Sequence, residues 1–513
     1  MSRTAKFVVN AAASYLRMLV SIAAVAVLTP YIIARIGRDD FGLWSLVISA
    51  LGFLSLIDLG FGTGVVKFVA ECKASGNVER RNRILSTLSA VYLAIALVSG
   101  ACIVALSIFF NRIFAIPAAQ GQKATAVLWI LAVRFVLLAL PLGLFRNALY
   151  GEQKVYLINV IQIVATIVYA LGSWVALLRG FGVVALAWVN LGAMLIEYLG
   201  YAWFAFSTMD GLRISRKLLD KGLLRQAASF SSAQFLINIA ALILLRTDPL
   251  IVKAFLPLSA VAIYAVALKI AENAYLLTKQ FTNLLGPLAT ELKENAEETK
   301  IRFLFVNCTK FAMAPSVMLT AAMYVLGRET LGFWAGQDFT AGGIVLMVLL
   351  TSMTFSVAEL TSSAVLSMTG HHRITARAAV AKIFLNVGLS VLLVRPLGLA
   401  GIAAGTLAAT VLIDVLVTVR RACELHGVTY GSYLIRAFAP ALLPGVAQFA
   451  LTLALKRWSA PTGLFSTLIL MVPGAVLYLL LFWLFSIERS EKDLLVSKLQ
   501  RRYRPVTAAG IAN

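Results

Sequence analysis

Charged residues are scarce in this 513-residue chain. Asp, Glu, Lys and Arg make up 13% of it, against 60% hydrophobic residues, and the mean hydropathy is +0.89. So few polar side chains could not cover the surface of a soluble protein of this size, which excludes a soluble globular fold. Uncharged stretches near or above the ~20 residues that a helix needs to cross a bilayer occur at residues 84–110, 155–178, 339–358, 437–455 and 458–487. A multi-pass membrane protein is predicted.

Residues that carry cofactor or metal chemistry are equally sparse. The chain has three histidines, and its four cysteines are scattered without metal-ligand spacing, at Cys72, Cys102, Cys308 and Cys423. They are interpreted as small apolar packing residues. No glycine-rich phosphate loop encodes an ATP-driven engine, and no loop is long enough for a catalytic domain. We therefore expect no enzyme activity, no cofactor and no metal. Despite a net charge of +22, the absence of a basic soluble domain argues against nucleic acid as a partner.

The membrane fold is predicted to be helical. Alternating ten-residue segments, which are typical of outer-membrane barrels, are absent. In lipid the backbone must satisfy its own hydrogen bonds, which a helix does within one segment. Breaks at glycine, proline and charged residues predict fourteen spans, roughly at 12–35, 41–66, 84–110, 124–148, 155–178, 182–206, 228–252, 258–288, 303–327, 339–368, 374–395, 398–419, 432–455 and 462–487.

The sequence contains a repeat with a shift of 219 residues. Short patterns that begin at Pro30, Gly151 and Gly182 recur at positions 249, 370 and 401. This indicates duplication of an apolar unit, and paired membrane lobes are a transporter architecture. The predicted organisation is an N-terminal six-helix lobe (1–206), a cytoplasmic linker (207–225), a C-terminal six-helix lobe (226–425), two additional transmembrane helices (426–487) and a cytoplasmic tail (488–513).

Lys and Arg are distributed unevenly over the predicted loops. The side that holds both termini has 28 of them and the opposite side has 11. Because basic residues concentrate in cytoplasmic loops, both termini are predicted to be cytoplasmic.

Several charged residues fall inside the predicted spans. Such residues are costly in lipid and usually face a protein interior or a wet cavity. Five basic residues are therefore candidates for a cationic, substrate-binding cavity that would suit a diphosphate, whose oxygens Lys and Arg bind strongly: Arg17, Arg134, Lys269, Lys310 and Lys382. Two alternatives stay open. Lys269 can pair with Glu272 on the same helix, and Arg17 and Lys310 can extend to the headgroups. Among the acidic residues, Glu359 is a candidate for coupling to a proton or sodium ion.

The first seventy residues carry a recognisable pattern. Pro30 to Gly37, then Phe41 to Trp44, then Asp58 to Gly62, resemble the start of bacterial polysaccharide exporters. These are the O-antigen and exopolysaccharide flippases of the Wzx type, in the multidrug/oligosaccharidyl-lipid/polysaccharide superfamily. Glycines that close or open later spans also fit, at Gly151, Gly180, Gly182, Gly370, Gly398 and Gly401. The resemblance covers residues 1–425 and does not identify the sugar.

The resemblance implies a V-shaped pair of six-helix lobes around a cavity. A polyprenyl-diphosphate-linked oligosaccharide would be taken from the inner leaflet of the bacterial inner membrane and released to the outer leaflet by alternating access. Implied partners are this lipid-linked glycan, membrane lipids, a glycan polymerase and glycosyltransferases. Two alternatives remain: a flippase for the lipid-linked peptidoglycan precursor, and a cation-coupled multidrug exporter. Multidrug exporters of the superfamily usually have an acid in the first span, where this chain has Arg17.

Overall fold

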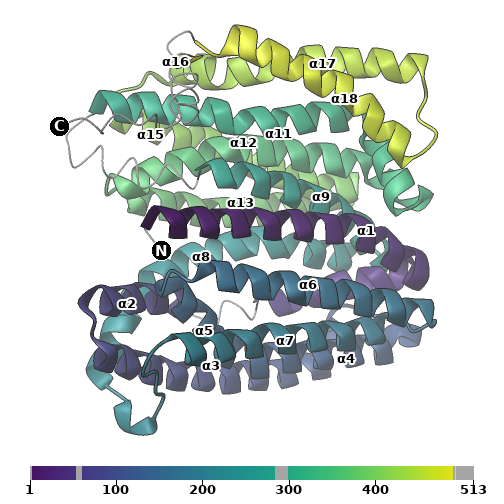
Figure 1. Cartoon of the computed structure of the whole chain (residues 1–513). Coiled ribbons are helices and arrows are strands. Elements are labelled where there is room, and N and C mark those ends of the chain that lie inside the picture. The colour runs from purple at the N-terminus through teal and green to yellow at the C-terminus, as the bar shows by residue number, and fades with distance from the viewer. Residues whose placement is uncertain (1–2, 54–59, 283–297, 489–490, 493–513) are drawn as a thin grey trace, which may run out of the picture. The chain divides into compact units, whose positions relative to one another are not determined.

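The structure, a computed structural model, describes residues 3–53, 60–282, 298–488 and 491–492 (Figure 1). Within these ranges every regular element is a helix, so the predicted all-α membrane fold is confirmed. Asp58 of the N-terminal pattern and residues 493–513 of the predicted tail lie outside the described residues.

The described part of the chain is a succession of helices. In chain order they are α1 (Arg3–Gly52), α2 (Phe61–Ser75), α3 (Val78–Ile113), α4 (Ala118–Val133), the π-helix η2 (Arg134–Ala139), α5 (Leu140–Gly151), α6 (Val155–Leu178), α7 (Val183–Thr208), the 3-10 helix η3 (Arg216–Leu218), α8 (Lys221–Phe255), α9 (Leu258–Thr282), α11 (Glu298–Ala335), the 3-10 helix η4 (Gln337–Gly342), α12 (Gly343–Met368), α13 (His372–Leu397), α14 (Leu399–Ala409), the π-helix η5 (Thr410–Val419), α15 (Arg420–Leu425), α16 (Tyr430–Tyr433), the π-helix η6 (Leu434–Phe438), α17 (Ala439–Trp458), α18 (Leu464–Leu481) and the π-helix η7 (Phe482–Ser486).

Eleven helices of the described part are long and apolar enough to cross a membrane. One of them, Ala12–Gly52, has 41 residues, about twice the length of one crossing. Gly37 interrupts it with a φ of 80°, a conformation that glycine adopts without steric cost. This break separates the spans predicted at 12–35 and 41–66. The total of fourteen spans stays a prediction.

The chain divides into two compact units. Unit 1 comprises Met1–Ile270, Trp334–Val345 and Ala376–Ala409, and unit 2 comprises Ala271–Phe333, Leu346–Thr375 and Thr410–Asn513. The predicted lobe boundaries and the V-shaped arrangement stay predictions.

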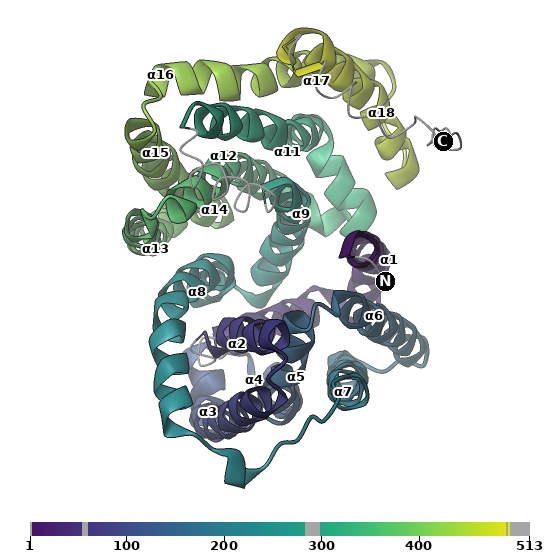
Figure 2. The same cartoon turned by 60° about the vertical axis from the view of Figure 1, so that its left-hand side comes forward.

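The core of unit 1 includes a bundle in which α2, α3, α5, α6 and α7 meet, seen end-on in Figure 2. Buried leucines and aromatic rings fill it, among them Leu85, Leu144 and Tyr201. Gly151, one of the repeat marks, ends α5 at a point where α2 comes close. A Cβ atom there would lie 2.7 Å from the Cβ of Val69. The glycine is therefore required by packing.

Gly42 of the N-terminal pattern is also explained by close packing. A Cβ atom at this position would lie 2.1 Å from the carbonyl oxygen of Leu258, the first residue of α9. We expect Gly42→Ala to destabilise the protein by about 1–3 kcal/mol, the usual cost of overpacking a tight contact. Thermal unfolding of the purified protein measures this effect. Gly388→Ala is the matched control, because nothing lies within 4 Å of the added carbon. Equal unfolding temperatures for the two variants would contradict the explanation.

The core of unit 2 joins α11 and α12 to the last two long helices. Figure 1 shows α17 and α18 running alongside α11. Phe305 stacks on Tyr433 with ring centroids 4.7 Å apart, and the Tyr433 hydroxyl lies 2.9 Å from the hydroxyl of Thr309. Gln448 of α17 donates to the carbonyl oxygen of Met318 in α11 at 2.9 Å. The two helices outside the repeat are thus an integral part of unit 2.

Candidate functional site

The predicted cationic residues are divided between the two units. Arg17, Arg134, Lys269 and Lys382 belong to unit 1, whereas Lys310 and the predicted coupling residue Glu359 belong to unit 2. Each of the two arginines donates a hydrogen bond to the side-chain oxygen of an asparagine. The three lysines have other surroundings.

Arg134 occupies an irregular point in the middle of a membrane-spanning segment. It begins the π-helix η2, which separates α4 from α5 within the apolar stretch Ala118–Gly151. Such single π-turns are frequent at functional sites, and Pro141, which has no N–H to donate, follows directly. The half-buried guanidinium donates through Nη1 to Oδ1 of Asn190 in α7 at 2.6 Å. Within the described part of the chain it forms no ion pair, so its positive charge is held by a neutral amide.

The nearby acid of α7 is engaged by neutral donors instead. Glu197 accepts a hydrogen bond from the Tyr201 hydroxyl at 2.6 Å and a longer one from Nε2 of Gln162 in α6 at 3.4 Å. The carboxylate is thereby stabilised by neutral donors, and it interacts electrostatically with Arg134 without forming an ion pair with it. The interior of α4, α6 and α7 therefore combines one cation, one anion and several amide and hydroxyl groups.

Arg17 on α1 is held by the same kind of contact. Its Nε donates to Oδ1 of Asn159 in α6 at 3.0 Å, and Nδ2 of Asn159 donates to the Ser14 hydroxyl at 2.9 Å. Arg17 lies on α1, which packs against α6, and Arg134 lies on η2 and binds α7, which packs against the same helix. In each case one N–H of a guanidinium with five donors is used by a carboxamide oxygen, so donors remain for a ligand.

The two lysines of unit 1 are weaker candidates for substrate binding than the arginines. Lys269 is exposed on α9, and Lys382 is half-buried on α13. Both side chains interact with other groups of the chain, so neither is an unpaired cation. Their predicted role in a cavity stays a prediction.

Lys310 is neutralised within unit 2. Its Nζ donates to both carboxylate oxygens of Glu491 at 2.7 Å, and the two side chains are only 3% and 4% exposed. A buried cation that is paired in this way has no free charge to attract a substrate. We therefore leave Lys310 out of the site proposed below.

Glu359 lies half-buried on α12 and accepts a hydrogen bond from the Ser363 hydroxyl one turn further along. This contact caps one oxygen of the carboxylate with a neutral donor of the same helix. Its predicted role in ion coupling stays a prediction.

Sequence reasoning missed a buried carboxylate in unit 1. Asp248 of α8 is 2% exposed. Its Oδ2 accepts hydrogen bonds from the Tyr264 hydroxyl of α9 and, at 3.2 Å, from the Thr406 hydroxyl of α14. Thr406 in turn accepts from Nδ2 of Asn386 in α13 at 2.9 Å. Four helices thus converge on one acid.

Two buried oxygens of this cluster have no hydrogen-bond partner among the residues that the structure describes: Oδ1 of Asp248 and Oδ1 of Asn386. The carbonyl oxygen of Ile402 lies in the same place, because it accepts from the hydroxyls of both Ser390 and Thr406. Unpaired buried oxygens are costly, and such a set of hard oxygen ligands suits a small cation or a proton. A signal was present in the sequence. Asp248 directly precedes the repeated Pro249, and the equivalent residue of the first copy is Thr29.

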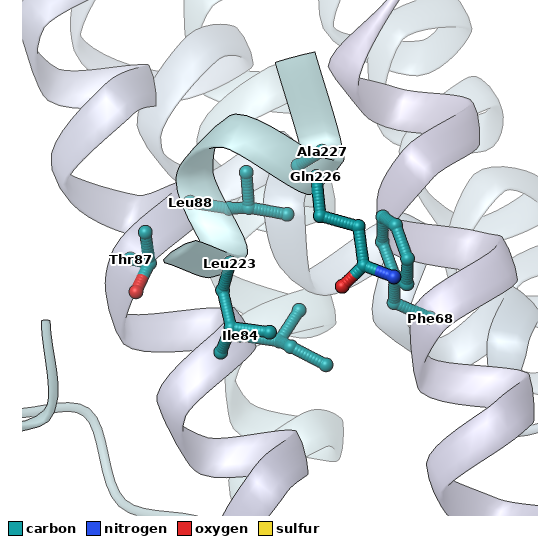
Figure 3. Close-up of a pocket in the computed structure, with 7 residues that line it drawn as sticks. All are labelled: Phe68, Ile84, Thr87, Leu88, Leu223, Gln226 and Ala227. Atoms are coloured by element: carbon teal, nitrogen blue, oxygen red, sulfur yellow. The ribbon is translucent and has the colours of Figure 1, made fainter. Parts of the chain in front are cut away.

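The described residues also form a pocket between α2, α3 and the start of α8 (Figure 3). It is narrow and has no charged residue in its lining, which consists of Phe68, Ile84, Thr87, Leu88, Leu223, Gln226 and Ala227. The amide of Gln226 points toward Phe68 (Figure 3). The pocket is therefore not the predicted cationic site.

Solved structures agree with this architecture. The chain superposes on the lipid II flippase MurJ in its inward closed conformation with a TM-score of 0.71, covering 96% of this chain and 100% of MurJ at 14% identity. At that identity the likeness concerns the fold alone. The predicted transporter fold is confirmed.

Curated relatives agree with the resemblance in the sequence. The chain is 22% identical over 365 residues to the uncharacterized membrane protein EpsK of Bacillus subtilis, covering 69% of this chain and 70% of EpsK. It is 22% identical over 380 residues to Agl15 of Haloferax volcanii, described as a probable low-salt glycan biosynthesis flippase, covering 72% and 74%. The family model described as polysaccharide biosynthesis protein matches residues 7–280. Since that match spans more than half of the chain, the protein belongs to the polysaccharide biosynthesis family of membrane transporters.

Proposed function

We propose that this protein is a flippase for a polyprenyl-diphosphate-linked oligosaccharide, an O-antigen or exopolysaccharide repeat unit. It acts in the bacterial inner membrane with both termini in the cytoplasm, and it moves its substrate without changing it chemically. The family membership and the flippase description of Agl15 support this substrate class. The 28-to-11 asymmetry of basic residues supports the orientation.

The observation that carries the proposal is the pairing of Arg134 with a neutral amide. A diphosphate and a glycan cannot cross ~30 Å of hydrocarbon unaided. A cation at mid-span that a carboxylate has already neutralised would not attract the anionic substrate. Arg134 keeps its charge, and Asn190 fixes the guanidinium at 2.6 Å without cancelling that charge.

The planar guanidinium offers a diphosphate two parallel N–H groups. Arg–phosphate contacts are often bidentate and stronger than neutral hydrogen bonds. Arg17, held in the same manner by Asn159 of α6, supplies a second set of donors. We propose these two arginines as the anion-binding pair, with Gln162 and Tyr201 as neutral groups for the sugar hydroxyls.

The test is neutral substitution at the first of these residues. We expect Arg134→Gln to lower glycan export by about 10- to 100-fold, since hydrogen bonds to charged groups contribute about 1.5–3 kcal/mol. Export is measured as surface polysaccharide in cells that lack the native gene, with membrane abundance checked by immunoblot. Arg134→Lys should retain more activity because it keeps the charge, although it loses the bidentate geometry.

Arg179→Gln is the matched control for this experiment. Arg179 is an exposed arginine just after α6 and forms no ion pair with a described residue. Normal surface polysaccharide in the Arg134→Gln cells, or an equal loss in the Arg179→Gln cells, would remove Arg134 from the proposed site.

We further propose Asp248 as the residue that couples transport to a cation. Two buried oxygens, on Asp248 and Asn386, have no hydrogen-bond partner among the described residues, and this supports the assignment. Binding of a proton or a small cation would neutralise the carboxylate and draw α8, α13 and α14 together. Release would leave an uncompensated buried charge, so the two states would differ in packing.

The lipid-linked peptidoglycan precursor remains the second candidate substrate, because the MurJ superposition covers nearly the whole chain. It shares the diphosphate and the prenyl chain, so Arg17 and Arg134 would serve it equally. Rescue of cells depleted of their own lipid II flippase would favour this substrate. Restoration of surface polysaccharide alone would favour the glycan proposed here.

A further inference from the structure

The segment between α7 and α8, residues 209–225, is here called the basic linker. It carries five exposed cations: Arg213, Arg216, Lys217, Lys221 and Arg225. None of the five forms an ion pair with any residue that the structure describes. Elsewhere on the surface of the chain basic residues do find acidic partners, as Arg83 does with Glu79 at 2.6 Å. The basic linker therefore presents positive charge that the protein itself leaves uncompensated.

The two acids of the linker do not cancel this charge. Asp220 caps the N-terminus of α8, where its Oδ1 accepts hydrogen bonds from the backbone N–H groups of Gly222 and Leu223 at 2.8 and 3.1 Å. Asp210 lies at the far end, next to α7, and its backbone carbonyl is held by Arg81. Five cations thus face solvent with two acids among them, one of which is committed to a helix cap.

Four hydrogen bonds fix the backbone of the linker along the first turns of α3. Arg81 and Asn82 donate to the carbonyl oxygens of Asp210 and Gly211 at 2.6 and 2.7 Å. The N–H groups of Ser215 and Asp220 donate to hydroxyls of α3 at 3.1 and 3.0 Å. The backbone that bears the cations is therefore held in place, which reduces the conformational entropy lost when a charged partner binds.

Apolar side chains of the same segment alternate between two directions. Leu212, Ile214 and Leu223 pack against the core of unit 1, and Figure 3 shows Leu223 beside Ile84. Leu219 and Leu224 face outward and are 50% and 37% exposed. Outward leucines between outward cations form the pattern of a segment that lies in a membrane interface.

The chain itself places the linker at a membrane surface. It follows directly on α7, which is long and apolar enough to cross a membrane, so the linker begins where a candidate span ends. We propose that the basic linker binds the phosphate headgroups of anionic phospholipids in the cytoplasmic leaflet, with Leu219 and Leu224 inserted between them. Charge complementarity selects this partner, because Lys and Arg near a bilayer are attracted to its anionic lipids.

The test uses the full-length protein in nanodiscs of two compositions, phosphatidylcholine alone and phosphatidylcholine with phosphatidylglycerol. We expect the anionic lipid to raise the unfolding temperature of the wild-type protein. The triple variant R213Q/R216Q/K217Q should lose more than half of that rise, and the charge-retaining variant R213K/R216K should keep it. About 0.5 M salt should remove the rise in the wild type, since screening at that ionic strength acts within a few ångströms.

The control variant R112Q/R179Q/R457Q removes the same number of exposed cations from the predicted outer side and should keep the full rise. An undiminished rise in R213Q/R216Q/K217Q would overturn the proposal. Loss of glycan export in that variant with an unchanged lipid response would also overturn it, in favour of an acidic protein partner. No glycan is present in the nanodisc assay, so its result is independent of the proposed transport function.

Discussion

Asp248→Asn is expected to uncouple transport from its cation gradient while leaving the protein folded. The asparagine keeps the shape of the side chain and can still accept hydrogen bonds from Tyr264 and Thr406. It cannot carry the negative charge that a cation or a proton neutralises. We expect the cation concentration for half-maximal transport to rise at least about tenfold, since a charged hydrogen-bonding group contributes about 1.5–3 kcal/mol.

The measurement is flux of a lipid-linked glycan in proteoliposomes with an imposed sodium or proton gradient, each applied separately. Dependence on one gradient only identifies the coupling ion. Asn386→Ala should show the same change in weaker form, because its unpaired oxygen belongs to the same cluster. Glu359→Gln is the decisive comparison. If that variant loses coupling and Asp248→Asn does not, the coupling site lies in unit 2 and the assignment of Asp248 is wrong.

Glu491→Gln is expected to destabilise the protein by about 3–5 kcal/mol, because it leaves the ammonium group of Lys310 buried without a counter-charge. Both side chains are almost fully enclosed, and Lys310 donates to both oxygens of the carboxylate at 2.7 Å. The readout is the unfolding temperature of the purified protein. The double variant Lys310→Met/Glu491→Leu should recover most of the loss, since replacing both members of a buried pair by apolar residues is often neutral.

Glu79→Gln provides the matched control for this effect. Glu79 pairs with Arg83 at 2.6 Å, but the two side chains are 72% and 48% exposed. An exposed pair of this kind contributes about 0–1 kcal/mol because water and salt screen it. If the Glu79 and Glu491 variants unfold at the same temperature, the buried pair with Lys310 contributes no more to stability than an exposed pair.

The class of protein and its helices could be predicted from the sequence because they depend on local composition. A stretch such as 155–178 contains no charged residue and became α6 almost residue for residue, Val155–Leu178. The positions of some glycines could also be interpreted without knowledge of the tertiary structure. Gly180 and Gly398, predicted at the opening of a span, have φ angles of 81° and 57°, which other residues rarely adopt.

The residues of the site could not all be predicted from composition, because their roles depend on which side chains they contact in the folded protein. The sequence made both Arg134 and Lys310 candidates for the cavity, because both lie within predicted apolar spans. Their partners differ: a neutral amide from α7 for Arg134, and a carboxylate 181 residues away for Lys310. Asp248 was missed because one acid near the end of a span resembles an interfacial residue until Tyr264, Asn386 and Thr406 are seen around it.

The sequence by itself determined that this chain is a helical membrane protein of the polysaccharide biosynthesis family, because hydrophobic length and the glycine pattern can both be recognised in short stretches of consecutive residues. Tertiary structure alone decided which charges remain available. Whether a buried ion is neutralised depends on side chains that folding brings within about 3 Å, and those side chains come from helices far apart in the chain.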